Sequence, residues 1–132
     1  MYTEVITDNV QLFQHSDKNG ITEKETITAK INNEYAGDIK VSISFDPRHY
    51  WITALYVVPQ FRGRGIAKTL VNAVIQLYSD KPICLTPYAY KDKPKSDEEL
   101  VSMYKHLGFK EISGQKHYLI YNHKHEITNI NN

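Results

Sequence analysis

The chain has 132 residues, of which 41% are hydrophobic and 23% charged, and its formal net charge is +1. This length and composition are those of one globular domain, and the near-neutral charge gives no electrostatic argument for a nucleic-acid or membrane partner. The single cysteine, Cys84, excludes an intrachain disulfide framework, and no apolar run reaches the roughly 18 residues that span a bilayer. We therefore expect a soluble cytoplasmic protein, with one domain over residues 1–124 and a flexible tail over residues 125–132.

Three strands are expected in the first half of the chain. Residues 27–31 and 39–45 alternate apolar and polar side chains, which is the period of a half-buried strand. The link between them is rich in asparagine and glycine, so it predicts an antiparallel hairpin. Residues 51–58 are apolar on both faces, as in a central strand, and Pro59 ends this stretch.

The apolar spacing becomes helical after residue 65. Ile66, Leu70, Val74 and Tyr78 form one i,i+4 row of a predicted helix. A short strand over residues 83–86 follows, so strand, helix and strand predict a parallel βαβ unit.

A second helix is predicted to begin after Ser96 and to end before Gly108, and a last strand lies around residues 117–121. The fold class expected from these elements is α/β (α+β): a mixed central sheet with a parallel βαβ unit and helices on both faces.

Two glycines, Gly63 and Gly65, stand at the mouth of the first predicted helix, although glycine costs about 1 kcal/mol relative to alanine inside a helix. Backbone amides at a helix start have no intrahelical partner, and the helix dipole places partial positive charge there. Without Cβ atoms these amides can approach a phosphate closely, and Arg62, Arg64 and Lys68 add positive charge. The turn therefore predicts a pyrophosphate-binding site.

Two other glycine-rich motifs do not match this turn. A Walker A loop needs a glycine where Ala67 stands, and a dinucleotide fingerprint needs its third glycine at Lys68, so both fail. The simpler alternative is a loop with solvated arginines.

The segment resembles the acetyl-CoA signature of the GNAT N-acetyltransferases, Q/R-x-x-G-x-G/A, with Gln60, Gly63 and Gly65 at its fixed positions. A second landmark of that family, Tyr-x-x-x-Gly-Phe, is matched by the stretch from Tyr104 to Phe109. The resemblance covers roughly residues 27–121. It implies a GNAT-like fold with acetyl-CoA as co-substrate and no metal.

The resemblance also implies roles for individual residues. The pantetheine arm of acetyl-CoA would lie between two splayed parallel strands, paired with backbone groups of Val57 and Val58. Tyr104 would act as the general acid that protonates the departing thiolate, although its place on the apolar row of its helix also fits a role in the core. The diphosphate would be held by residues 62–68, namely Arg62, Gly63, Arg64, Gly65, Ile66, Ala67 and Lys68.

The general base stays open at this point. Many relatives carry a glutamate on the central strand where this chain has Thr53. Asp46, His49, Tyr88 and Tyr90 are candidates for holding a water that relays the proton.

The activity implied is transfer of an acetyl group to a primary amine. Relatives place two helices between their first two strands, but residues 13–26 are almost all polar here, which predicts a shortened N-terminal helical region and an open acceptor groove. An open groove suits a protein lysine or N-terminus. A non-catalytic acyl-CoA-binding or interaction module and a small-molecule amine acetyltransferase remain alternatives. An exposed edge strand would allow a monomer or a homodimer.

Overall fold

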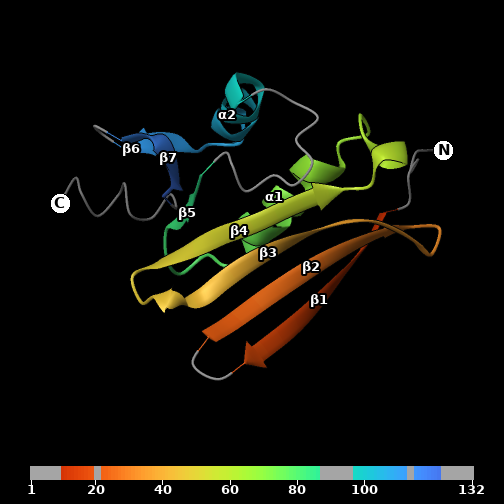
Figure 1. Cartoon of the computed structure of the whole chain (residues 1–132), viewed down its shortest axis with the longest axis horizontal. Helices are drawn as coiled ribbons and strands as arrows, with labels where there is room; N and C mark the ends of the chain where they lie inside the picture. Colours follow the sequence, from red (N-terminus) through yellow and green to blue (C-terminus); the bar gives the residue numbers. More distant parts are fainter. Residues whose placement is uncertain (1–9, 20–21, 87–96, 113–114, 123–132) are drawn as a thin grey trace.

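One seven-stranded sheet and two α-helices make up the fold (Figure 1). The computed structural model describes residues 10–19, 22–86, 97–112 and 115–122. The strands lie in the order β1-β2-β3-β4-β5-β7-β6. Their bounds are β1 Val10–Asn19, β2 Thr22–Ile31, β3 Glu34–Asp46, β4 His49–Val57, β5 Ile83–Leu85, β6 Lys110–Ile112 and β7 Gln115–Tyr121, and the helices are η1 Pro59–Phe61 (3-10), α1 Ile66–Leu77 and α2 Asp97–His106.

Among the described strands, β4 and β5 form the parallel pair, and every other neighbouring pair is antiparallel. Helix α1 connects β4 to β5, so the predicted fold class and its βαβ unit are confirmed. The predicted hairpin between β2 and β3 is also present. Its turn consists of Asn32 and Asn33 with φ of 51° and 68°, the positive values that a mirror-image hairpin turn requires.

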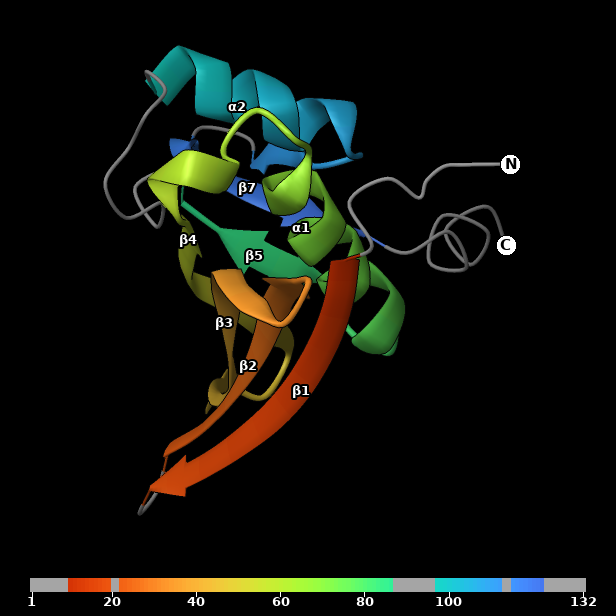
Figure 2. The same cartoon turned by 90° about the vertical axis from the view of Figure 1, so that its right-hand side faces the viewer.

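Strand β1 was not predicted. It pairs with β2 along its whole length, from Val10 opposite Ile31 to Asn19 opposite Thr22. Residues 11–18 are exposed, because β1 is an edge strand, and such a strand carries little of the alternation by which strands are recognised. The joined ends of β1 and β2 project beyond the rest of the sheet, away from both helices (Figure 2).

The two described helices lie against one face of the sheet, whereas helices on both faces were expected. Tyr50, Ile83 and Tyr121 are Cα partners across β4, β5 and β7, so their side chains share a face. The ring of Tyr78, which follows α1, contacts Tyr50, and the ring of Phe109, which follows α2, contacts Tyr121. The β1–β2 ladder leaves only residues 20 and 21 between these two strands, so the two helices that the resemblance places there do not fit, as the polar segment predicted.

Helix α1 buries its predicted row in the core. Ile66, Leu70, Val74 and Tyr78 are all buried, as the i,i+4 spacing predicted. They pack on β2, β3 and β4, which fixes the start of α1 beside the end of β4. No helix in the described part of the chain is long and apolar enough to cross a membrane.

A buried carboxylate links the edge of the sheet to the end of α1. Glu25 of β2 is only 6% exposed. Its carboxylate oxygens accept hydrogen bonds from Gln14 Nε2 at 2.7 Å, from the Tyr78 hydroxyl at 3.0 Å and from the Ser16 hydroxyl. Burial raises the pKa of Glu25, but the hydrogen bonds from Ser16, Gln14 and Tyr78 together hold it below its ordinary value of 4.5.

Replacing this carboxylate should make the fold less stable and less sensitive to acid. We expect Glu25→Gln to lower the free energy of unfolding at pH 7 by about 1–3 kcal/mol, because one buried acceptor of the network is lost. In the parent protein the Glu25 contribution is complete above about pH 5 and is lost as the pH falls through the lowered folded-state pKa, since the unfolded chain takes up the proton first.

Chemical unfolding of both proteins between pH 3 and 7 measures this difference. Glu23→Gln is the control, because Glu23 pairs only loosely with the exposed Lys18, at 3.9 Å. A change of about 0.5 kcal/mol or less is expected for it. Parallel pH curves for the parent and Glu25→Gln would contradict the role given to Glu25.

Candidate functional site

The candidate site begins where β4 loses its parallel neighbour. Pairing between β4 and β5 ends at Ile52 and Leu85, whereas β4 continues to Val57. At the same place the β3–β4 register shifts, because Lys40 faces Ala54 but the next residue of β3 faces Ile52. Thr53 is therefore the extra residue of a β-bulge, which bends the strand and increases its twist. The edge of β4 beyond Thr53 is no longer paired with β5.

The glycine turn follows this free edge and opens α1. Gly63 and Gly65 have φ of 83° and 80°, in the left-handed region that favours glycine, and Gly65 is the N-cap of α1. A Cβ placed on either glycine would meet no atom within 4 Å, so the space beside the turn is open. The first amides of α1 face that space without intrahelical partners, as an anion site requires.

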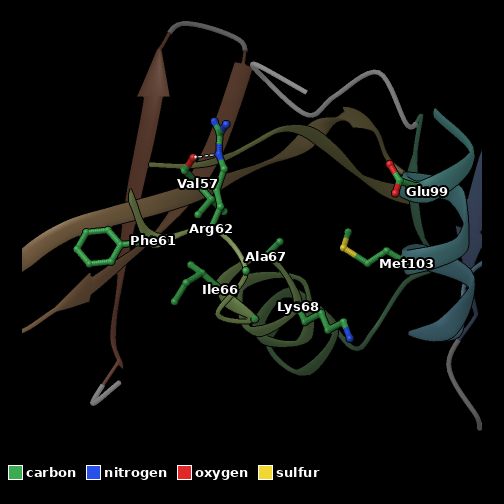
Figure 3. A pocket seen from close by; sticks show the side chains of 10 residues that line it. Val57, Phe61, Arg62, Ile66, Ala67, Lys68, Glu99 and Met103 are labelled. Atoms are coloured by element: carbon green, nitrogen blue, oxygen red, sulfur yellow. Dashed lines mark hydrogen bonds between the residues drawn. The ribbon is translucent and has the colours of Figure 1, made fainter. Parts of the chain in front are cut away.

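A cleft of about 430 Å³ lies over the glycine turn, between α1 and α2. Lys68 is in the first turn of α1, where a cation is disfavoured by the helix dipole unless an anion is nearby, and that turn holds no acidic residue. Glu99 and Met103 extend from α2 across the cleft toward Ala67 and Lys68 (Figure 3). The residues lining this main cleft are Val57, Phe61, Arg62, Gly63, Gly65, Ile66, Ala67, Lys68, Glu99 and Met103.

The two arginines of the turn pack against aromatic rings of the protein. The guanidinium of Arg62 points away from α1 (Figure 3); its Nε donates a hydrogen bond of 2.9 Å to the Val57 carbonyl, and the group stacks over the Tyr56 ring. Its Nη2 is buried and has no hydrogen-bond acceptor among the described residues. Arg64 lies over the ring of Phe61, 5.3 Å from the ring centre. Arg62 thus ties the turn to β4, and Lys68 is the cation that extends toward α2.

The two valines at the end of β4 differ in what they can offer a ligand. The Val58 amide donates to the Ala36 carbonyl at 2.8 Å and is therefore used within the sheet. Amides of successive strand residues point in opposite directions, so the backbone groups of Val57 face the side that β5 has left. The Arg62 bond to the Val57 carbonyl comes from that same side.

Tyr104 lies in the core of the fold. Its side chain is fully buried, and its ring packs edge to face on Phe109 at 5.6 Å. It does not line the main cleft, whereas its neighbour Met103 does. Met103 was not predicted as a site residue, although Leu100, Met103, Tyr104 and Leu107 form one i,i+3,i+4,i+7 row, and that row was the signal for a helix face turned inward.

None of the base candidates lies next to the bulge in the described residues. His49 Nδ1 is 3.1 Å from Asp46 Oδ2, but His49 precedes Thr53 by four residues, or about 13 Å along a strand. A backbone hydrogen bond from Arg48 and the bond with His49 lower the pKa of Asp46 to about 2. Tyr88 and Tyr90 lie outside the described residues. No group of three His, Cys, Asp or Glu side chains in the described ranges could hold a metal ion.

Comparison with known proteins identifies the family. The profile of the acetyltransferase (GNAT) family matches residues 3–109, most of the chain. The chain belongs to this family. None of the curated proteins matches it. The family resemblance seen in the glycine turn and in the Tyr104–Phe109 stretch is therefore confirmed.

Solved structures share the fold of this GNAT chain at low sequence identity. The PaiA N-acetyltransferase of Thermoplasma acidophilum, solved with coenzyme A, has 18% identity and a TM-score of 0.57, and the match covers 74% of this chain and 60% of that one. A Bacillus anthracis protein solved with acetyl coenzyme A has 15% identity and a TM-score of 0.60, with 76% and 63% covered. An anti-CRISPR protein has 22% identity and a TM-score of 0.56, with 74% and 98% covered. The match thus spans only about 60% of the first of these chains.

The role given to Arg62 can be tested by two substitutions. Arg62→Ala should lower the free energy of unfolding by about 1–2 kcal/mol and weaken coenzyme A binding, because the turn loses its bond to β4. Arg62→Lys keeps the charge but lacks the planar Nε–H group, so it should restore neither property. Thermal unfolding and calorimetric titration measure both effects. Full recovery of affinity in Arg62→Lys would show that the charge itself acts on the ligand.

Proposed function

We propose that this GNAT chain transfers the acetyl group of acetyl-CoA to a primary amine. The observation that carries the proposal is the glycine turn at the start of α1, which presents the first amides of the helix and Lys68 beside the part of β4 that is no longer paired with β5. A diphosphate fits the turn, because the space beside Gly63 and Gly65 is open and the first amides of α1 lie at the positive end of the helix dipole. An amide-containing arm fits the edge of β4, which can pair with it as a strand does.

The reaction itself needs an attacking amine, a polarised carbonyl and a proton for the leaving thiolate. The amine nitrogen bonds to the thioester carbon, the carbon–sulfur bond breaks, and the sulfur takes up a proton while the amine loses one. A backbone amide on the free edge of β4 can stabilise the oxyanion by a fixed dipole. For the proton we propose Tyr104, on the α2 row whose Met103 lines the main cleft.

The acceptor proposed is a protein lysine or N-terminus. The two helices that wall the acceptor site in relatives lie between their first two strands, where this chain has the β1–β2 hairpin instead. Both described helices lie on the face of the sheet that carries Tyr50 and Tyr121. The face near the bulge carries Trp51 and Tyr118, whose rings meet edge to face at 6.1 Å.

Turnover with different amines tests the activity and the acceptor class together. Calorimetric titration should show binding of acetyl-CoA. Free coenzyme A should form faster with lysine-containing peptides or proteins as acceptors than with aminoglycosides or polyamines. Gly65→Ala should weaken binding strongly, since its φ of 80° disfavours a side chain and the substitution would change the backbone of the turn. Binding without thiol release from any amine would instead favour a non-catalytic acyl-CoA module, and turnover confined to small amines would contradict the protein acceptor.

The proposed proton donor has its own test. Tyr104→Phe should lower kcat at least tenfold while leaving the dissociation constant of coenzyme A nearly unchanged, because only the hydroxyl is removed. The Tyr35→Phe variant, at an exposed tyrosine of β3 that does not line the main cleft, is the matched control. An unchanged kcat in Tyr104→Phe, or a loss explained entirely by lower thermal stability, would restrict Tyr104 to packing in the core.

A further inference from the structure

A second hollow adjoins the main cleft on the side of α2. It has a volume of about 350 Å³, and its lining residues are Lys68, Glu99, Ser102, Met103 and His106. Three of these, Lys68, Glu99 and Met103, also line the main cleft, so the two spaces adjoin along these side chains. A ligand seated on the glycine turn can therefore extend along α2 into this side hollow.

The side hollow brings together donors from two helices. Lys68 lies in the first turn of α1, and Ser102 and His106 lie one turn apart on α2. Lys68, Ser102 and His106 can all donate hydrogen bonds, so this end of the hollow suits an anion. Glu99 lies nearly two turns before His106 on the same helix face, so its negative charge is at the opposite end of the α2 lining.

We propose that the side hollow binds the 3′-phosphate of coenzyme A, held by Lys68 and His106 with Ser102 as a further donor. This inference rests on the proposed donor substrate and adds a specificity determinant to it. A diphosphate on the glycine turn occupies the first amides of α1 and leaves the more distant donors of α2 unused. The ribose phosphate of coenzyme A is a third anionic group on the same molecule, and these donors line a space that adjoins the main cleft.

The assignment explains why the cleft carries charges of both signs. Glu99 would repel a phosphate but can accept hydrogen bonds from ribose hydroxyl or adenine amino groups. The Glu99 end of the hollow therefore suits the neutral part of the nucleotide, and the Lys68 and His106 end suits its phosphate. Charge placed in this way discriminates coenzyme A from the same molecule without its 3′-phosphate.

Calorimetric titration with coenzyme A and with 3′-dephospho-coenzyme A tests the proposal. The parent protein should bind coenzyme A roughly tenfold more tightly, the effect expected of one lysine and two further hydrogen-bond donors on a partly solvated phosphate. His106→Gln should weaken coenzyme A binding severalfold and leave the dephospho compound unchanged. Lys68→Gln should weaken both, because Lys68 also lies beside the diphosphate. The preference of the parent should shrink at high salt.

Two further variants make the test sharper. Glu99→Gln should raise the affinity for coenzyme A more than for the dephospho compound, which is opposite in sign to His106→Gln. Lys105→Gln is the matched control, because Lys105 neighbours His106 on α2 but pairs with Glu111 at 3.3 Å, and it should change neither affinity.

The titrations distinguish failure of the side-hollow proposal from failure of the acetyl-CoA proposal. Equal affinity of the parent for the two compounds, or an equal loss for both in His106→Gln, would overturn the side-hollow proposal and leave the acetyl-CoA proposal standing. Binding of neither compound by the folded parent protein would overturn the acetyl-CoA proposal, and this inference with it.

Discussion

The site depends on one feature of the sheet, which is that β4 keeps its antiparallel partner β3 while it loses its parallel partner β5 after Ile52. The bulge at Thr53 supplies the bend, and Arg62 occupies the Val57 carbonyl at the far end of the free edge. A sheet edge left inside a fold needs a partner for its backbone groups. The part of β4 that β5 has left and the glycine turn therefore adjoin one another, from the end of the strand to the start of the helix.

An element could be predicted where its side-chain pattern or its backbone conformation requires particular residue types. Two examples are the apolar row from Ile66 to Tyr78, whose i,i+4 spacing is visible in the sequence, and the turn at Asn32-Asn33, where positive φ favours asparagine. Strand β1 left no such mark, since its side chains are exposed and its place is set by backbone pairing with β2. The bulge at Thr53 could not be predicted either, because it depends on the register between β3 and β4 and not on the sequence around Thr53 alone.

The candidate site was predictable in its backbone and less so in its side chains. Gly63 and Gly65 identified the turn, because few other uses explain two glycines at a helix start. The direction of Arg62 was not predictable, since an arginine in an anion-binding motif is naturally assigned to the anion. The roles of Glu99 and Met103 depended on how α2 is set against α1, which is a matter of tertiary packing.

The cations of the turn differ in what their side chains contact. Arg62 has a planar group that can bond the Val57 carbonyl and stack on Tyr56 at once, which a lysine could not do. Lys68 has a single mobile charge at the positive end of a helix dipole, where it adds repulsion unless an anion is present. Because the fold keeps that unfavourable lysine beside two glycines with open space, the simplest physical account is that an anionic ligand completes the structure.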